Sequence, residues 1–184
     1  MPIKKIEWAA EISLTEQQRI TQPAESLPHL LQLMHFNDLH GRLTNFSKDQ
    51  CEPVISRMAA GIRSAREAAA KKSDTSVLVL SAGDDCSGSI YDEFLLLHGD
   101  EDSVHPSYQL YSHLGVDLAG LGNHDLDFGV ISLVDSIGRD ARFPILAANI
   151  KTCKELQSIC HLGAIIETSG IRIGVIGLVT RAEV

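Results

Sequence analysis

The loop from Gly122 to Gly129 gathers side chains that can do chemistry. Between its glycines it places an amide, an imidazole and two carboxylates on Asn123, His124, Asp125 and Asp127. Glycine permits left-handed backbone and close approach, so such a loop can aim several polar groups at one point. The same residue types are typical of a solvated turn, so the loop alone leaves both interpretations open.

Two further polar turns lie upstream, each directly after an apolar run. Asp38 and His40 follow the run 30–36, and Asp84 follows the run 76–81. Asp and His two residues apart can both turn toward one ion, and a carboxylate such as that of Asp84 can bridge two. Oxygen donors with imidazole suit Mn, Zn, Fe or Mg. Two cations about 3.5–4 Å apart can clamp a phosphoryl oxygen and activate a water as the nucleophile.

Beside such a site, His124 need not be a ligand. Its imidazole can stabilise developing charge or protonate a leaving oxygen. A carboxylate three residues on, that of Asp127, can orient the ring.

The elements that would position these turns alternate between strands and helices. Apolar runs predict strands at 30–36, 76–81, 116–121 and 143–147, the first two of them buried, and the segments 164–168 and 171–178 predict a hairpin. Apolar spacing predicts a helix opened by Pro53, and further helices at about 91–97, 106–114 and 130–137. Cations on the first helix are interpreted as a solvated face: Arg57, Arg63, Arg66, Lys71 and Lys72.

This alternation predicts an α/β fold with a largely parallel or mixed sheet and helices on both faces. Ligand sites in such sheets lie beyond the carboxyl ends of the strands. We therefore expect the three polar turns to meet at one edge, although they are far apart in the sequence.

Composition narrows the class of protein. With 184 residues, 44% of them apolar and 22% charged, the chain suits one globular domain. A net charge of −8 argues against a sequence-independent nucleic-acid binder. No apolar run approaches the roughly 18 residues of a membrane span, so no membrane partner is expected.

The first 28 residues predict an extension with at most a short helix. Glu7, Glu11 and Glu16 stand where a signal peptide needs an apolar core, so the sequence as written predicts a cytoplasmic protein, or a periplasmic or extracellular one if a leader was removed. The cysteines show no C-x-x-C spacing and are expected to be free buried thiols: Cys51, Cys86, Cys153 and Cys160.

Taken in order, the three turns resemble the first three signature blocks of the calcineurin-like metallophosphoesterases. More narrowly they resemble the 5′-nucleotidase and 2′,3′-cyclic-nucleotide phosphodiesterase family. The blocks are Asn-Asp-Leu-His-Gly-Arg at 37–42, Ala-Gly-Asp at 82–84 and Leu-Gly-Asn-His-Asp-Leu-Asp-Phe-Gly at 121–129, with supporting matches at 143–149 and 171–180. The resemblance implies a layered α/β metallophosphoesterase fold in which 29–184 form the N-terminal part of a catalytic domain whose C-terminal half is incomplete.

The resemblance also implies roles for individual residues. Asp38 and His40 would bind one of two divalent ions, Asp84 would bridge the two and Asn123 would bind the second. His124 with Asp127 would form a dyad at the phosphate of a small-molecule ester, a nucleotide in this family. Asn149 would lie near the site in a structural or substrate-facing role.

This sequence departs from the family pattern at the two residues after Asp84 and in the downstream metal ligands. Asp85 would be a further carboxylate near the site or a surface residue, and Cys86 a metal-proximal or a buried thiol. The family's further ligand histidines follow the 171–178 strand in a Gly-His-x-His block that this sequence lacks, and His161, which precedes that strand, is interpreted as a surface or loop histidine. We therefore expect partial metal binding and little turnover from this chain by itself.

The resemblance implies an enzyme that uses metal ions to hydrolyse phosphate esters of nucleotides. Two alternatives remain beside this hydrolase. One is a non-catalytic scaffold or binding domain with the same fold. The other, a Rossmann-type nucleotide-binding protein, suits the strand-helix alternation but finds no G-x-G-x-x-G after the first strand.

Overall fold

The protein is described from a computed structural model that covers residues 5–8, 29–46, 51–98, 106–169 and 171–180. Most of the predicted N-terminal extension lies outside these ranges. No described helix is both long and apolar enough to cross a membrane.

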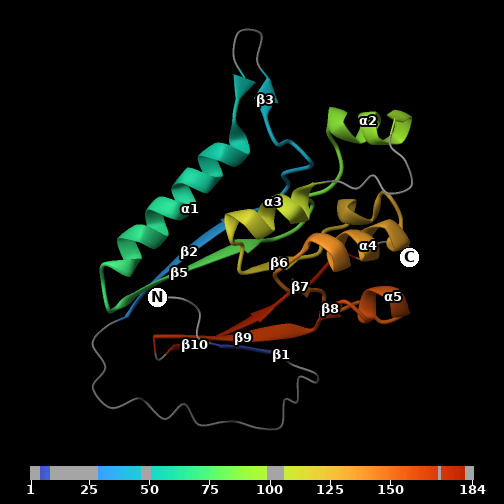
Figure 1. The fold of residues 1–184 in the computed structure, drawn as a ribbon. Coiled ribbons are helices and arrows are strands. Elements are labelled where there is room, and N and C mark those ends of the chain that lie inside the picture. Colours follow the sequence, from blue (N-terminus) through green and yellow to red (C-terminus); the bar gives the residue numbers. More distant parts are fainter. Residues whose placement is uncertain (1–4, 9–28, 47–50, 99–105, 170, 181–184) are drawn as a thin grey trace.

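A parallel sheet of five strands runs through the middle of the molecule (Figure 1). Its β-branched and apolar residues suit a sheet covered on both faces. The β5 strand matches the predicted buried strand, with most of its residues buried. The strands, in spatial order, are β2 (Leu30–Phe36), β5 (Thr75–Ser81), β6 (Leu118–Gly120), β7 (Ile145–Leu146) and β8 (Cys160–His161).

Four helices pack on one face of this sheet. Their apolar faces meet alternate residues of the strands, such as Val79 of β5 and Ile145 of β7, in the larger hydrophobic cluster. Leu133 and Ile137, one turn apart on α4, are both buried there, as the three- and four-residue spacing predicted. The helices are α1 (Val54–Ala70), α3 (Ser107–Leu114), α4 (Val130–Asp140) and the short α5 (Lys154–Gln157).

A second sheet covers the opposite face. Leu78, Leu118 and Leu146 of the parallel sheet pack there against Ala164 and Ile166. The second sheet has the order β1-β9-β10 and is antiparallel, formed by β1 (Lys5–Trp8), β9 (Gly163–Thr168) and β10 (Ile171–Ile176).

The predicted α/β class is therefore confirmed, with differences in detail. Among the described residues the parallel and antiparallel strands form separate sheets rather than one mixed sheet, and helices cover only one face of the parallel sheet. The predicted hairpin is confirmed as β9 and β10. The 5–8 segment, expected to be an extension with at most a short helix, contributes strand β1, because it pairs with β9.

The β2 strand is less buried than predicted. It lies at an edge of its sheet, and Leu30 and Leu33 are 56% and 55% exposed. An apolar run therefore identified the strand correctly but could not distinguish an edge from a central position, which depends on the neighbours of the strand.

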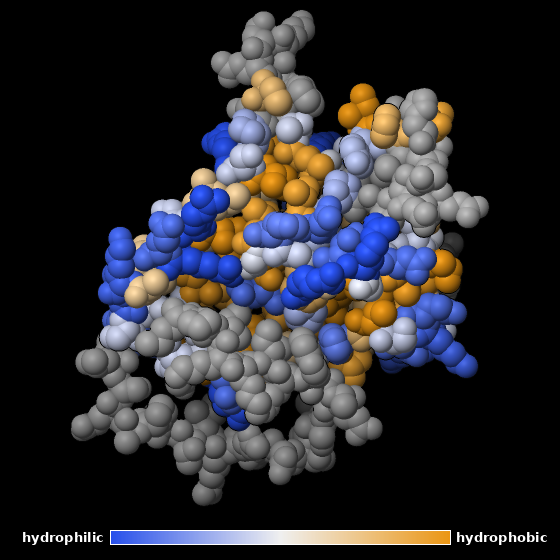
Figure 2. Space-filling view, in the orientation of Figure 1, coloured by the Kyte–Doolittle hydropathy of each residue, from blue (hydrophilic) through white to orange (hydrophobic). Residues whose placement is uncertain are grey.

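The remaining elements lie in or after the polar turns at the carboxyl ends of the parallel strands. Helix α2 (Ile90–His98), at the upper right of Figure 1, exposes Ile90, Phe94 and Leu97. Figure 2 shows hydrophobic (orange) atoms on the surface in that part of the molecule. Two short strands, β3 (Asn45–Phe46) and β4 (Cys51–Glu52), pair with each other, and η1 (His124–Leu126) is one turn of 3₁₀ helix.

Three sequence-based interpretations differ from the structure. Arg66 is not on a purely solvated face, because its guanidinium reaches across to the carboxylate of Asp117, 3.0 and 3.1 Å from the two oxygens. The cysteines are free, but Cys86 alone is buried; Cys51 is exposed, and Cys153 and Cys160 are half-buried. His161, interpreted as a surface or loop histidine, lies in strand β8 and is half-buried.

Candidate metal centre

The turns after β2 and β5 are held together by backbone hydrogen bonds. The N–H of Asp38 donates to the carbonyl of Gly83 at 3.0 Å, and the N–H of His40 donates to the carbonyl of Asp84 at 2.9 Å. Because β2 and β5 are adjacent parallel strands in register, their carboxyl ends are side by side, and the two polar turns continue the pairing beyond the sheet.

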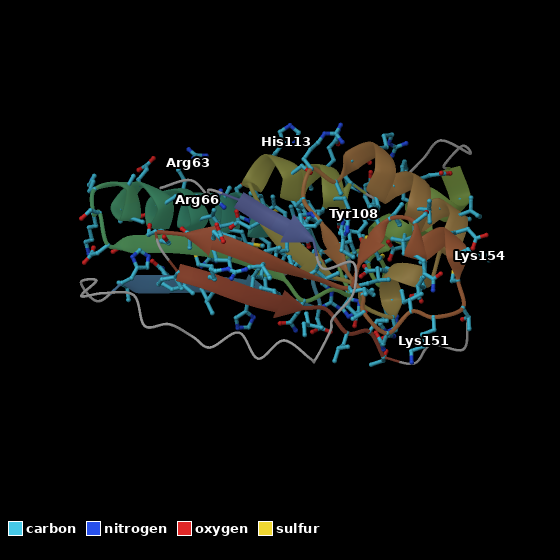
Figure 3. All side chains as sticks on the ribbon, turned by 90° about the horizontal axis from the view of Figure 1, so that it is seen from below. Arg63, Arg66, Tyr108, His113, Lys151 and Lys154 are labelled. Atoms are coloured by element: carbon cyan, nitrogen blue, oxygen red, sulfur yellow. The ribbon has the colours of Figure 1, made fainter. Side chains whose placement is uncertain are left out.

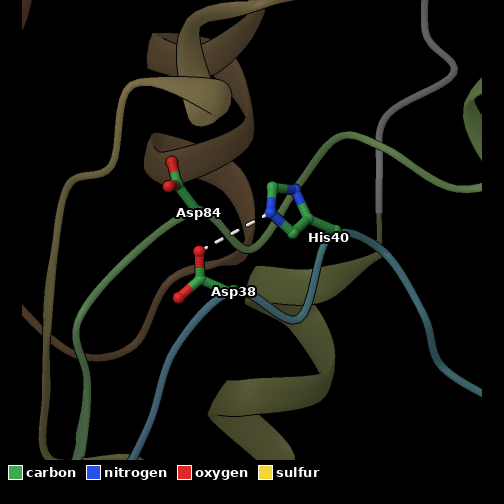
Figure 4. Close-up of side chains that lie close together, drawn as sticks. All are labelled: Asp38, His40 and Asp84. Atoms are coloured by element: carbon green, nitrogen blue, oxygen red, sulfur yellow. Dashed lines mark ion pairs between the residues drawn. The ribbon is translucent and has the colours of Figure 1, made fainter.

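The three side chains predicted to start the metal site lie together (Figure 4). One ligand atom from each of Asp38, His40 and Asp84 lies within 4.8 Å of the other two. Nε2 of His40 is 3.6 Å from Oδ1 of Asp38. All three are at least partly exposed, so an ion could reach them from solvent.

The backbone at these three residues is unusual. Asp38, His40 and Asp84 have φ angles of +54°, +49° and +58°. Left-handed backbone is unfavourable by roughly 1–2 kcal/mol for a residue with a Cβ, and such conformations cluster at functional sites. The hydrogen bonds between the two turns offset that cost and aim the three side chains at one point.

Asp125 fixes the turn after β5. Its carboxylate is 2% exposed and accepts hydrogen bonds from the backbone N–H groups of Asp84, Asp85, Cys86 and Gly122, over 2.9 to 3.1 Å. Burial raises the pKa of Asp125, while the donors from Gly122, Asp85 and Cys86 lower it. Asp125 had no predicted role of its own. The local bond to Gly122 was detectable as a turn pattern, but the other donors lie about forty residues away.

Two glycines allow the second and third turns to touch. A Cβ on Gly122 would lie 2.2 Å from both the N and the Oδ1 of Asp84, and one on Gly83 would lie 2.4 Å from the N of Gly122. Only glycine fits at this contact, so these residues are needed for packing as well as for turn geometry.

The third turn contributes Asn123 and a hydrogen-bonded pair. The N–H of His124 donates to Oδ1 of Asp84 at 2.8 Å, which brings the turn to the cluster. Oδ1 of Asn123 accepts a hydrogen bond from the hydroxyl of Thr180 at 3.2 Å. The His124 and His40 rings lie edge to face with centroids 5.1 Å apart.

His124 and Asp127 form the predicted pair, with Nδ1 of the imidazole 2.9 Å from Oδ2 of the carboxylate. The hydrogen bond from His124 to Asp127 raises the pKa of His124. For Asp127, burial raises the pKa, but the hydrogen bonds from Ser87 and His124 together lower it by more than burial raises it. The net pKa of Asp127 therefore falls. Both shifts favour the ion pair of an imidazolium and a carboxylate.

Asp85 and Cys86 point away from the cluster into the core. Asp85 is 1% exposed and accepts hydrogen bonds from the hydroxyls of Ser81 and Tyr111, so its interpretation as a surface residue is wrong. Burial raises the pKa of Asp85 to about 7. Burial also raises the pKa of the Cys86 thiol, which favours the interpretation as a plain buried thiol.

Asn149 is engaged with the backbone of Val179. Its amide nitrogen donates to the Val179 carbonyl at 2.6 Å, and its amide oxygen accepts from the Val179 N–H at 3.0 Å. This pairing joins the segment after β7 to the segment after β10. It supports the structural role of Asn149; the substrate-facing role stays a prediction.

A cavity of about 550 Å³ lies beside His40. A Cβ on Gly88, which lines this cavity, would lie 3.0 Å from Nδ1 of His40, so the cavity wall touches the His40 ring through Gly88. Its wall combines apolar and cationic groups: Gly41, Arg42, Leu43, Thr44, Gly88, Ser89, Ile90 and Tyr91.

The donor set of the cluster fits a divalent cation. Carboxylate oxygen and imidazole nitrogen are the ligands of Zn, Mn and Fe sites, and carboxylate oxygen also suits Mg. The carbonyl of Ser87 lies 2.7 Å from Nδ1 of His40, which fixes the hydrogen on Nδ1 and leaves Nε2 free to bind a metal.

Comparisons with known proteins agree with this geometry. No protein-family profile matches the chain. A 5′-nucleotidase from Bos taurus is 35% identical over 139 residues, which cover 71% of this chain and 22% of the relative. A solved 5′-nucleotidase precursor from Thermus thermophilus superposes with a TM-score of 0.61 at 28% identity, over 82% of this chain and 28% of that one.

The chain belongs to the calcineurin-like 5′-nucleotidase family. The calcineurin-like phosphoesterase YfkN from Bacillus subtilis also superposes, with a TM-score of 0.59 and 25% identity over 81% of this chain and 48% of that one. Members of the metallophosphoesterase family use divalent metals. The chain spans only about a quarter of the length of the 5′-nucleotidases that it matches.

Proposed function

We propose that this chain carries part of a divalent-metal centre that hydrolyses phosphate esters of nucleotides, of the 5′-nucleotidase or cyclic-nucleotide phosphodiesterase type. The observation that carries the proposal is the convergence of Asp38, His40 and Asp84, three left-handed residues from two turns, beside the His124–Asp127 pair. The similarity to 5′-nucleotidases supports the choice of substrate.

Two divalent ions, when bound, would neutralise phosphoryl oxygens and activate a water for attack. In this proposal Asp38 and His40 would hold one ion, the Asn123 amide oxygen would hold the second, and Asp84 would help to hold both. Oδ1 of Asn123 already accepts a hydrogen bond from the Thr180 hydroxyl. To hold the second ion as well, it would use one lone pair for that hydrogen bond and the other for the metal.

The His124–Asp127 pair would serve the leaving group. With Nδ1 directed at the Asp127 carboxylate, the Nε2 edge of the ring remains for the ester oxygen. The raised pKa of His124 keeps a larger fraction of it protonated near neutral pH, which suits transfer of a proton to that oxygen. The cavity beside His40 provides room for the organic part of the ester.

Calorimetric titration with Mn²⁺ tests the metal centre. We expect wild-type chain to bind the ion and Asp84→Asn to weaken binding by about 10-fold to 100-fold, while Asp135→Asn, an exposed carboxylate on α4, changes nothing. Equal affinities for all three proteins would contradict the proposal. Two tight sites would show that the downstream histidines of the family are replaced from within this chain.

Hydrolysis of bis(p-nitrophenyl) phosphate and of AMP by the gene product, with and without chelator, tests the reaction. We expect metal-dependent turnover that His124→Ala reduces by about 100-fold or more. Metal binding without turnover of either ester would favour the non-catalytic scaffold.

A further inference from the structure

Ser87 touches both histidines of the candidate centre. Its carbonyl oxygen lies 2.7 Å from Nδ1 of His40. Its hydroxyl lies 2.5 Å from Oδ2 of Asp127 and 2.9 Å from the carbonyl oxygen of His124. Ser87 itself is 4% exposed and lies between the turn after β5 and helix α2.

The carbonyl of Ser87 sets the tautomer of His40. A carbonyl can only accept, so Nδ1 of His40 must carry the hydrogen of this bond. The lone pair of a neutral imidazole is then on Nε2, the atom that faces Asp38.

The hydroxyl of Ser87 acts on the other histidine through Asp127. Ser87 has one hydroxyl hydrogen, and the bond to the carboxylate is the shorter, as expected for a charge-assisted hydrogen bond. Oδ2 of Asp127 is also the oxygen that pairs with Nδ1 of His124. The hydroxyl therefore restrains the carboxylate that orients the imidazole.

The backbone on both sides of Ser87 is held by buried carboxylates. Asp125 accepts from the N–H groups of the three preceding residues. Asp92, which is 8% exposed, accepts from the N–H groups of Gly88 and Ser89. A segment restrained at both ends places the carbonyl and the hydroxyl of Ser87 in fixed directions.

We propose that Ser87 is a positioning residue that orients His40 through its carbonyl and the His124–Asp127 pair through its hydroxyl. Its importance for hydrolysis rests on the proposed function, but the two contacts do not. Because the two arms are different atoms, a substitution of the side chain separates them. Ser87→Ala removes the hydroxyl and leaves the carbonyl in place.

Nitrogen NMR of the histidine side chains, in chelator-treated chain, tests the contacts directly. In Ser87→Ala we expect the ¹⁵N signals of His40 to keep the pattern of hydrogen on Nδ1, while the signals of His124 shift. Ser87→Thr, which retains a hydroxyl, should restore the His124 signals. Unchanged His124 signals in Ser87→Ala would overturn the proposal, whether or not the protein hydrolyses an ester.

Activity of the gene product tests the consequence. In Ser87→Ala we expect kcat for bis(p-nitrophenyl) phosphate to fall by about 10-fold to 100-fold, with Mn²⁺ affinity unchanged because the His40 contact survives. Combined with Asp127→Asn, Ser87→Ala should cost nothing further, because it acts through the same carboxylate. If the two single substitutions lower kcat by factors that multiply in the double variant, the proposal is overturned. It is also overturned if Ser87→Ala lowers the affinity for Mn²⁺ together with kcat.

Ser107→Ala is the matched control. Ser107 is also buried, and its hydroxyl donates to the backbone carbonyl of Asp85, two residues before Ser87, at 2.9 Å. We expect this variant to lose stability without shifting the His124 signals. If Ser107→Ala shifts them as much as Ser87→Ala, the effect is general loosening and the proposal fails. A wild-type protein without metal binding or turnover would refute the proposed function instead.

Discussion

Oδ1 of Asp84 accepts a hydrogen bond from the backbone N–H of His124 over 2.8 Å. This one contact joins the turn after β5 to the turn after β6, forty residues further along the chain. It places the residue predicted to bridge two ions directly beside the residue predicted to protonate the leaving group.

Gly122→Ala should disrupt the contact between the turns. The added methyl would lie 2.2 Å from the backbone N and from Oδ1 of Asp84, and neither can move without breaking hydrogen bonds. We expect a loss of about 1 to 3 kcal/mol in the free energy of unfolding, measured by urea denaturation, and weaker Mn²⁺ binding. Gly138→Ala on α4, where nothing lies within 4 Å, should instead stabilise by about 0.5 to 1 kcal/mol.

Asp125→Asn should destabilise the turn after β5. An amide directs its own N–H groups at some of the four backbone N–H donors that the carboxylate now accepts from. A buried donor without an acceptor costs about 1–3 kcal/mol, so we expect a loss of at least that size in urea denaturation. Exposed Asp135→Asn should stay within about 0.5 kcal/mol of wild type, and an equal effect of both variants would contradict this role.

Arg66→Ala should destabilise the packing of α1 on the sheet. Arg63 and Arg66 both project from α1 (Figure 3), but Arg66 pairs with Asp117, whose side chain is 13% exposed and also accepts from the N–H of Val79 at 2.7 Å. Without the guanidinium, a mostly buried carboxylate keeps only its backbone donor. Because Arg66 itself is 37% exposed, we expect a loss of about 1 to 3 kcal/mol rather than that of a fully buried pair.

Arg63→Ala is the control for that loss, since the side chain is exposed on the same helix. It should change the unfolding free energy by no more than about 0.5 kcal/mol. Comparable losses in the two variants, both measured by urea denaturation, would show that the Asp117 pair is not what stabilises the contact.

Asp85→Asn should flatten the pH dependence of stability. The pKa of Asp85 is raised from 3.8 to about 7 in the folded protein, mainly by burial. Between these two values the folded state holds a proton that the unfolded state releases, so stability falls as pH rises through this window and levels off above pH 7. The amide of the variant can still accept from Tyr111 and donate to Ser81, so its fold should survive.

The measurement is the thermal midpoint from pH 4 to pH 8 in chelator. We expect the midpoint of Asp85→Asn to fall less than that of wild type over this range, so that the variant is the more stable protein above pH 7. Parallel curves for the two proteins would show that Asp85 is ionised in the folded state at neutral pH.

Strands β2 and β5, the long helix α1 and the β9–β10 hairpin could be predicted from sequence because each depends on a local pattern. A run of seven residues that are mostly apolar or β-branched forms a strand wherever it lies in the sheet. The meeting of the three turns was also predictable, since parallel strands direct their carboxyl ends to one edge. Strand β8, with two residues, and α5, with four, lack a periodic signal, and β1 forms only because β9 lies beside it.

The chemical groups of the candidate centre, and the edge of the sheet at which they meet, were predictable because both follow from residue type and strand order. How those groups are held depends on contacts that form only in the folded chain. The carboxylate of Asp125, the hydroxyl of Ser87 and the guanidinium of Arg66 each bond to residues about forty or fifty positions away. No local pattern records such a contact, since it exists only after the chain has folded.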